Sequence, residues 1–236
     1  MELGEIISDA LTYPLNNIKA LVIYVILGII LGIAVGGTAI GVATGVALKN
    51  PFTAIGSGII GLIIALIIGF VISGYQLDIV KFGINRDAGS PGIDIVRQII
   101  NGVKLFVVQI VYYIIPIIIG AILALIFQHW LSGLITIILC IVFALAAFMA
   151  QCRLAKTEDL GNALAIGEAI GDISRVGIVK VLLFIILIFV IAFILALIVG
   201  FIYQWNGTVG GILMGILGVY LTFFVGRATG LLYSDV

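Results

Sequence analysis

The sequence has very few charged residues. Lysine and arginine together number 11, aspartate and glutamate also number 11, and the formal net charge at pH 7 is zero. Charged residues make up 9% of the chain, whereas an ordinary soluble domain has about 25%. The low charge content excludes an ordinary soluble domain, and the zero net charge argues against a nucleic acid partner.

Cysteine and histidine are also scarce. Cys140 and Cys152 are the only cysteines and lie in or beside apolar stretches, which is typical of free buried thiols and does not support a disulfide framework. The one histidine, His129, has no further metal-ligating side chains at a suitable spacing, and next to Trp130 we expect it at a membrane interface. The sequence offers no general base that would activate a nucleophilic serine or cysteine, and it contains no glycine-rich phosphate-binding loop. The sequence therefore indicates no cofactor, no metal site and no enzymatic activity.

Apolar residues, in contrast, dominate the chain. They make up 64% of it, and the mean hydropathy is +1.41. Six apolar stretches are each longer than the about 18 to 20 residues that cross about 30 Å of hydrocarbon as a helix, and they lack the alternation typical of membrane barrels. The first stretch, which has 28 residues, should tilt, protrude or break at Gly36-Gly37. The predicted spans cover residues 20–47, 53–77, 105–127, 131–152, 181–203 and 209–230.

The basic residues lie almost entirely on one side of these predicted spans. Ten of the 11 fall in the N-terminal segment, in residues 78–104 and 153–180, or in the C-terminal segment, and only Lys49 lies opposite. The positive-inside rule therefore places both termini in the cytoplasm. Trp130, Tyr203 and Trp205 lie at the opposite turns, where aromatic rings anchor to the membrane interface. We predict a multi-pass protein of the cell membrane.

An internal repeat is indicated by Lys19, Lys104 and Lys180, which each precede an apolar stretch and are 85 and 76 residues apart. Upstream of each lysine lies a segment with apolar residues at helical spacing. In the clearest segment Val96, Ile99, Ile100 and Val103 form one face, expected toward lipid or the bundle, and Asp94, Arg97, Gln98 and Asn101 form the other. The alternative is that any hairpin protein has charged, amphipathic entry segments.

The predicted fold class is therefore an all-α polytopic membrane protein with one membrane domain over residues 1–236. Its six transmembrane helices form three parallel hairpin repeats, each preceded by an amphipathic cytoplasmic interfacial helix. The repeat units cover roughly residues 5–81, 91–156 and 164–232.

Four short motifs carry a resemblance to a known family. They are Tyr13-Pro14, Gly74-Tyr75-Gln76-Leu77, Asn101-Gly102-Val103-Lys104 and Tyr112-Tyr113-Ile114-Ile115-Pro116. With them the chain resembles, over most of its length, the uncharacterised membrane-protein family catalogued as domain of unknown function 4013, found largely in methanogenic archaea. One loop departs from that family, because Ala88-Gly89-Ser90-Pro91 stands where a Leu-Pro with aromatic and acidic residues is usual. The resemblance implies an archaeal polytopic membrane protein and carries over no catalytic or binding residues.

The polar residues inside the predicted spans are all uncharged near the span midpoints. Ion-coupled transporters usually need a buried ionisable group, so this pattern argues against ion coupling. A passive pore can still be lined by hydroxyls, amides and backbone carbonyls. The candidates for such a pathway are Thr38, Thr44, Gln109 and the backbone freed by Pro116. The alternative for Gln109 is an ordinary hydrogen bond between helices.

Glycines recur every four residues in the first and last predicted spans. This spacing puts them on one helix face, where the absence of side chains lets two helix backbones approach closely. The alternative is that membrane helices are generally rich in glycine. The candidate packing residues are Gly28, Gly32, Gly36, Gly37, Gly41, Gly45, Gly207, Gly211 and Gly215. They would pack the first helix against the last, or serve a homo-oligomer.

Three charged residues, Asp78, Arg153 and Arg227, lie at corresponding positions near the cytoplasmic ends of the second, fourth and sixth predicted spans. Three hairpins around one axis would bring these ends together. We therefore predict that Asp78 pairs with Arg153 or Arg227 at the cytoplasmic mouth. In the alternative, each charge extends separately to water or lipid headgroups.

Three functions remain open at this point. The first is a non-catalytic membrane protein that organises lipid or a membrane-protein partner through its cytoplasmic helices, as the lack of buried charge and catalytic groups suggests. The second is a passive transporter or channel with a pathway between the three hairpins. The third is a membrane-embedded enzyme that uses the cytoplasmic carboxylates. A water-open cavity lined by Gln109 would favour the second, and a lipid-sealed bundle would favour the first.

Overall fold

A computed structural model describes residues 1–127 and 130–236, and for Gly207 and Thr208 it describes the backbone alone. The expectation for His129 lies outside the described residues. Within them, the regular secondary structure consists of nine helices and includes no strand. The helices are α1 (Leu3–Asn16), α2 (Ile18–Ala47), α3 (Pro51–Ile84), α4 (Ile95–Ile126), α5 (Trp130–Thr157), α6 (Leu160–Ala163), α7 (Ile166–Val176), α8 (Ile178–Trp205) and α9 (Gly207–Tyr233).

Six of these helices, α2, α3, α4, α5, α8 and α9, are long and apolar enough to cross a membrane. This confirms the prediction of an all-helical chain with six apolar helices of spanning length, which is typical of a multi-pass membrane protein. The helix α2 is continuous through Gly36-Gly37, which excludes a break there and leaves the other two predicted possibilities, tilt and protrusion. With 30 residues, α2 is about 45 Å long, which exceeds the hydrocarbon thickness and requires the helix to tilt or protrude.

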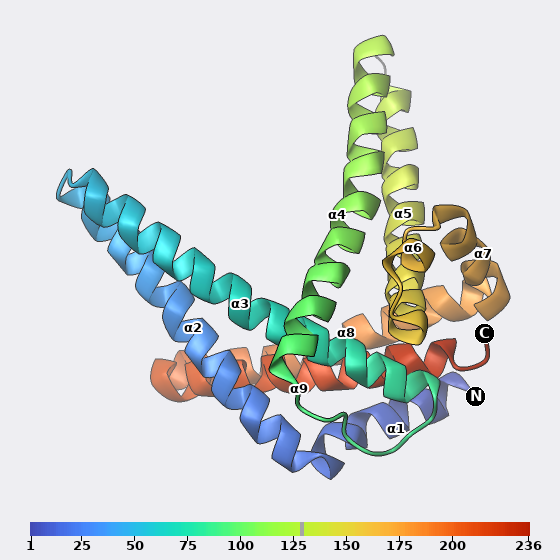
Figure 1. Cartoon of the computed structure of the whole chain (residues 1–236), viewed down its shortest axis with the longest axis horizontal. Coiled ribbons are helices and arrows are strands. Elements are labelled where there is room, and N and C mark those ends of the chain that lie inside the picture. Colours follow the sequence, from blue (N-terminus) through green and yellow to red (C-terminus); the bar gives the residue numbers. More distant parts are fainter. Residues whose placement is uncertain (128–129) are drawn as a thin grey trace.

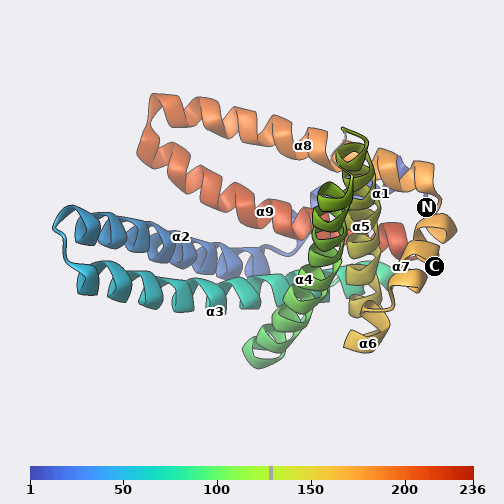
Figure 2. The same ribbon diagram turned by 90° about the horizontal axis from the view of Figure 1, so that it is seen from above.

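The long helices form antiparallel pairs that diverge from one common region (Figures 1 and 2). The pairs are α2 with α3, α4 with α5, and α8 with α9, and each turns back at the end far from α1 and α7. We call the common region the base; it comprises residues 3–24, 70–112, 145–184 and 219–233. The remaining parts of the pairs, residues 25–69, 113–144 and 185–218, are the arms. Both termini lie beside the base (Figure 1).

The hydrophobic core lies in the base. All buried Ala, Val, Ile, Leu, Met, Phe and Tyr residues of the described chain belong to it. In the most apolar 18 residues of each of the six long helices, only 11 to 28% of the residues are buried within the protein. The arms therefore expose apolar side chains along most of their length.

The crossing of α3 and α4 in the base depends on two glycines. Gly74 of α3 lies against the backbone of Gln98, and a Cβ atom added there would be 2.7 Å from the Gln98 Cα. Gly102 of α4 lies equally close to the backbone of Phe70. Each distance is shorter than van der Waals contact allows, so only glycine permits α3 and α4 to cross at this point. The crossing fixes which side chains of α3 and α4 meet.

The segment expected as a separate amphipathic helix before the third predicted span is instead the beginning of α4. The helix begins at Ile95, where the Asp94 side chain accepts a hydrogen bond from the Arg97 N–H at 3.1 Å. The helix continues to Ile126 with Gly102 and Pro116 inside it, so no turn separates an interfacial part from the span. The corresponding segments before α2 and α8 do end, at Asn17 and at Gly177, whose φ of 98° suits glycine.

Candidate functional site

Asp78 of α3 forms an ion pair in the base, but with a different residue from the one predicted. Its carboxylate lies 2.9 Å from Arg97 of α4, and its side chain is 3% exposed. The predicted pairing with Arg153 or Arg227 is wrong, because the glycine-mediated crossing of α3 and α4 places Arg97 beside Asp78. Arg97 also donates to the Gly92 carbonyl at 3.2 Å, which ties the loop before α4 to the pair.

Arg153, near the end of α5, pairs with Asp172 of α7. The guanidinium lies 3.1 Å from the Asp172 carboxylate, whose side chain is fully buried. Arg175 approaches the other carboxylate oxygen at 2.8 Å, and the Tyr233 hydroxyl donates to Asp172 as well. Asp172 therefore joins α5, α7 and α9 in one buried polar cluster.

Arg227 of α9 pairs with Asp9 of α1 at 2.7 Å, and the arginine side chain is 3% exposed. Its guanidinium also donates to the Asp87 carbonyl and lies 5.0 Å from the centre of the Tyr13 ring. Burial raises the pKa of Tyr13 to about 12, although the nearby Arg227 opposes this shift. Tyr13 therefore stays protonated and donates to the Gly89 carbonyl at 2.9 Å.

The three ion pairs have a common geometry. Asp78 with Arg97 and Arg153 with Asp172 are each separated by 19 residues. In both, the base end of the second helix of one pair contacts the segment that leads into the next helix pair. Arg227 at the end of the last pair contacts Asp9 in the segment that leads into the first. The three ion pairs therefore link the first helix pair to the second, the second to the third, and the third back to the first.

The polar face of residues 94–103 lies toward the interior of the base. Gln98 and Asn101 are 0% and 4% exposed, whereas Val96 and Ile100 are 69% and 51% exposed. The Tyr24 hydroxyl of α2 donates to the Gln98 side-chain oxygen at 2.6 Å. The apolar face therefore turns mostly away from the protein, although Ile99 on it is partly buried and packs against the core of the base.

The candidate packing glycines have different surroundings. A Cβ atom at Gly41 would lie 2.6 Å from Ser57 of α3, and one at Gly28 would lie 2.9 Å from Val219 of α9. Gly45 lies against the backbone of Ala54. An added Cβ atom would have no neighbouring atom within 4 Å at five of the candidates, which are Gly32, Gly36, Gly37, Gly211 and Gly215. Gly207 lies outside the residues whose surroundings are described.

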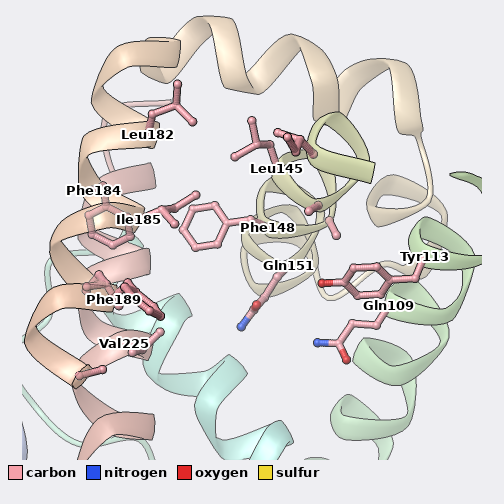
Figure 3. A pocket seen from close by; sticks show the side chains of 15 residues that line it. Gln109, Tyr113, Leu145, Phe148, Gln151, Leu182, Phe184, Ile185, Phe189 and Val225 are labelled. Carbon is pink, nitrogen blue, oxygen red and sulfur yellow. The ribbon is translucent and has the colours of Figure 1, made fainter. Parts of the chain in front are cut away.

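The pathway candidates do not line one cavity. Thr38 donates to the Ala34 carbonyl within α2 at 2.6 Å, and Thr44 lies near the far end of the same arm. Pro116 lines a cavity of about 420 Å³ between α4 and α5. Gln109 instead lines a groove of about 610 Å³ between the α4–α5 pair and α8 (Figure 3).

Sequence reasoning missed several residues that organise the base. Gly74 and Gly102 form the α3–α4 crossing, and Tyr112 donates a buried hydrogen bond to the Ala163 carbonyl at 2.9 Å. The signal was present, because all three belong to the motifs that resemble a known family. A glycine beside a large aromatic residue, as in Gly74-Tyr75, indicates a crossing only when the partner helix is known.

Most of the buried charges of the base form ion pairs between helices. No group of three or more His, Cys, Asp or Glu side chains in residues 1–127 and 130–236 is placed to hold a metal ion. The arrangement fastens helices to one another. The groove beside Gln109 brings polar side chains of α4 and α5 together.

Comparison with curated proteins and with solved structures gave no match. A family model described as "Protein of unknown function (DUF4013)" matches residues 55–204. This range runs from α3 through α8 and covers more than half of the chain, including three of the four motifs and both glycines of the α3–α4 crossing. The chain therefore belongs to the DUF4013 family of proteins of unknown function.

Proposed function

We propose that the protein is a non-catalytic membrane-organising protein that holds lipid between diverging helix hairpins. The observation that carries this proposal is the contrast between a packed base and arms that expose their apolar sides. In a membrane, such surfaces are covered by lipid chains or by helices of another protein. Divergent arms leave wedge-shaped spaces beside the base, which lipid chains fill because they are fluid.

The proposal includes three hairpin repeats arranged around one axis. It is supported by the three ion pairs, each of which fastens the end of one hairpin to the segment that leads into the next. The Arg227–Asp9 pair, at 2.7 Å, would close the ring. In this arrangement α1, which leads into the first hairpin, pairs with the end of the third hairpin, just as α7, which leads into the third, pairs with the end of the second. The segment that leads into the second hairpin differs, because it is continuous with α4.

The proposed topology places the base and both termini in the cytoplasm. It is supported by the positive-inside rule, since ten of the 11 basic residues belong to the base side of the spans. A membrane-impermeant thiol reagent added outside cells should label a cysteine at Asn50 or Asn206 and spare one at Ser90. The unsubstituted protein, with Cys140 and Cys152, gives the background, and external labelling at Ser90 would overturn the topology.

Cross-linking in vesicles tests whether the arms diverge. Cysteines at Asn50 and Asn206, at the far ends of two arms, should not be joined by a short bifunctional reagent. Cysteines that replace Arg86 and Ser234, whose side chains lie 3.2 Å apart in the base, should be joined and serve as the matched control. Efficient cross-linking of both pairs would mean that the arms close into a sealed bundle.

The second candidate function is passive transport along a pathway between the hairpins. The position of Gln109 in an open groove favours it. Reconstituted vesicles distinguish the two functions. Organisation of lipid predicts no solute flux above that of empty vesicles, whereas transport predicts a flux that Gln109→Leu reduces.

A further inference from the structure

The groove between the α4–α5 pair and α8 combines apolar walls with three uncharged polar side chains. Its volume is about 610 Å³, which is within the range of about 300 to 1,000 Å³ typical of small-molecule sites. Gln109 and Tyr113 come from α4 and Gln151 comes from α5. Figure 3 shows the two amide groups and the phenol hydroxyl directed toward the same part of the groove, opposite the aromatic and aliphatic side chains of α8.

These three polar groups lack hydrogen-bond partners among residues 1–127 and 130–236. Gln109 and Tyr113 are exposed, and Gln151 is half-buried. An amide that faces hydrocarbon without a partner costs free energy, because the bilayer core offers no water to replace the lost hydrogen bonds. Three such groups in one groove indicate that a partner from outside the chain completes them.

The depth of the groove restricts what that partner can be. Gln109 is five residues beyond Lys104, about 7.5 Å along α4, and Gln151 is two residues from Arg153, about 3 Å along α5. The polar headgroup layers add only about 5 to 8 Å on each side of a hydrocarbon core of about 30 Å. With Lys104 and Arg153 at the headgroup layer, Gln151 lies at the inner part of that layer, Gln109 lies at its boundary with the hydrocarbon, and Tyr113, nine residues beyond Lys104, lies inside the hydrocarbon.

The charge of the groove restricts the partner further. The residues that line it include no Asp, Glu, Lys, Arg or His, so a phosphate or ammonium headgroup would be desolvated there without a counter-charge. We infer that the groove binds a glycerol lipid whose head is a free hydroxyl, such as a diacylglycerol. Gln109, Gln151 and Tyr113 hold its hydroxyl and ester oxygens, and one chain lies against Phe148, Ile185 and Phe189. This inference rests on the proposed function, in which lipid occupies the space between hairpins.

The test is photo-cross-linking in phosphatidylcholine vesicles. The probe is a diacylglycerol with a diazirine in one acyl chain, and the comparison probe is phosphatidylcholine with the same chain. Labelled peptides are mapped by mass spectrometry. We expect the diacylglycerol to label α5 and α8 at the groove, and to do so at a lower concentration than phosphatidylcholine.

Replacing Gln109 and Gln151 together with Leu should weaken the labelling by diacylglycerol about tenfold, equivalent to about 1.4 kcal/mol for two hydrogen bonds in a membrane. The labelling by phosphatidylcholine should not change. Both glutamines lack protein partners, so this variant should melt in detergent at the wild-type temperature or above it. Gln204→Leu, at the exposed far end of α8, is the matched control and should change neither labelling.

The remaining outcomes overturn the inference in distinguishable ways. If both probes label the groove equally and the double variant changes neither, the groove holds ordinary lipid chains, and the proposed function stands without a specific site. If neither probe labels the arms or the groove, further copies of the chain cover these surfaces in the vesicles, and both proposals fail. A double variant that melts well below the wild type would show that the glutamines have protein partners, which also overturns the site.

Discussion

The base and the arms differ in charge, because the base carries ten of the 11 basic residues, and they differ in how closely some of their glycines are packed. In the base, Gly74 and Gly102 lie against the backbone of a crossing helix, and Gly230 of α9 does the same against α3. In the arms, Gly32 and Gly211 face open space, whereas Gly45 lies against the backbone of Ala54. All three arm glycines belong to series with the regular four-residue spacing. Regular spacing therefore does not identify a packed glycine; contact with a partner backbone does.

The largest expected effect contrasts these two kinds of glycine. Gly74→Leu or Gly102→Leu should prevent the crossing of α3 and α4, because the new side chain would overlap backbone atoms that cannot move aside. The loss of stability should exceed the about 1 to 3 kcal/mol typical of overpacking. Gly32→Leu and Gly211→Leu should stay within about 0.5 kcal/mol of the wild type, as surface substitutions do. Thermal unfolding in detergent measures all four.

Equal destabilisation by Gly32→Leu would mean that the arms pack against one another or against a second copy of the chain. Oligomer size in detergent, measured on the same four variants, separates these two cases. A change of size for Gly32→Leu and Gly211→Leu alone would assign the arm glycines to a homo-oligomer.

The second prediction concerns the ion pair between Asp78 and Arg97. A double-mutant cycle with Asp78→Asn and Arg97→Gln should give a coupling free energy of about 1 to 3 kcal/mol, because Asp78 is 3% exposed and loses its counter-charge. Cycles of Asp78→Asn with Arg153→Gln or Arg227→Gln should be additive within about 0.5 kcal/mol. Chemical unfolding in detergent supplies the free energies, and coupling to Arg153 would contradict the observed pairing.

The sequence alone predicts the elements of the arms better than the contacts of the base. Hydropathy is a local property, so the six apolar helices follow from composition and length. The partner of Asp78 is not local, because it depends on where α3 and α4 cross, and the crossing depends on Gly74 and Gly102 lying opposite backbone. Helical spacing likewise separates Val96 and Ile100 from Gln98 and Asn101 but does not say which face turns inward. In a membrane, an apolar face can turn toward lipid, so the usual rule that apolar residues face the interior does not decide the question.

The third prediction tests whether the polar face of the first turns of α4 lies toward the interior of the base. Gln98→Ala should cost about 1 to 3 kcal/mol, because it removes the buried acceptor of the Tyr24 hydroxyl, which lies at 2.6 Å. Ile100→Ala, on the exposed face, should cost about 0.5 kcal/mol or less. Thermal unfolding of the two variants in one detergent gives the comparison. A larger loss for Ile100→Ala would place the apolar face in the interior, as a soluble amphipathic helix would have it.

The smallest expected effect concerns an exposed contact at the edge of the base. Lys81 of α3 donates to Glu158, just after α5, at 2.6 Å, and this hydrogen bond holds the pKa of the Glu158 carboxyl below its usual value. The carboxyl is 42% exposed, so solvent screening limits the contribution to about 0 to 1 kcal/mol. Because the pKa is lowered in the folded state, the contribution is fully present above the unfolded pKa of about 4.3 and is lost as the pH falls through the folded value.

Glu158→Gln removes this titration and leaves the backbone carbonyl of residue 158, which accepts from Lys104 at 2.8 Å, in place. Other carboxyls of the protein also titrate in acid, so the informative quantity is the difference in melting temperature between the wild type and this variant. The difference should be small and constant at neutral pH, and it should shrink toward zero as the pH falls through the folded pKa of Glu158. The arms carry no carboxylate in residues 25–69, 113–127, 130–144 and 185–218, so a spin label at Asn50 should report unchanged mobility over the same range. A difference that persists unchanged into acid would mean that Glu158 acts through the shape of its side chain, and that its charge does not help to fasten α5 to α3.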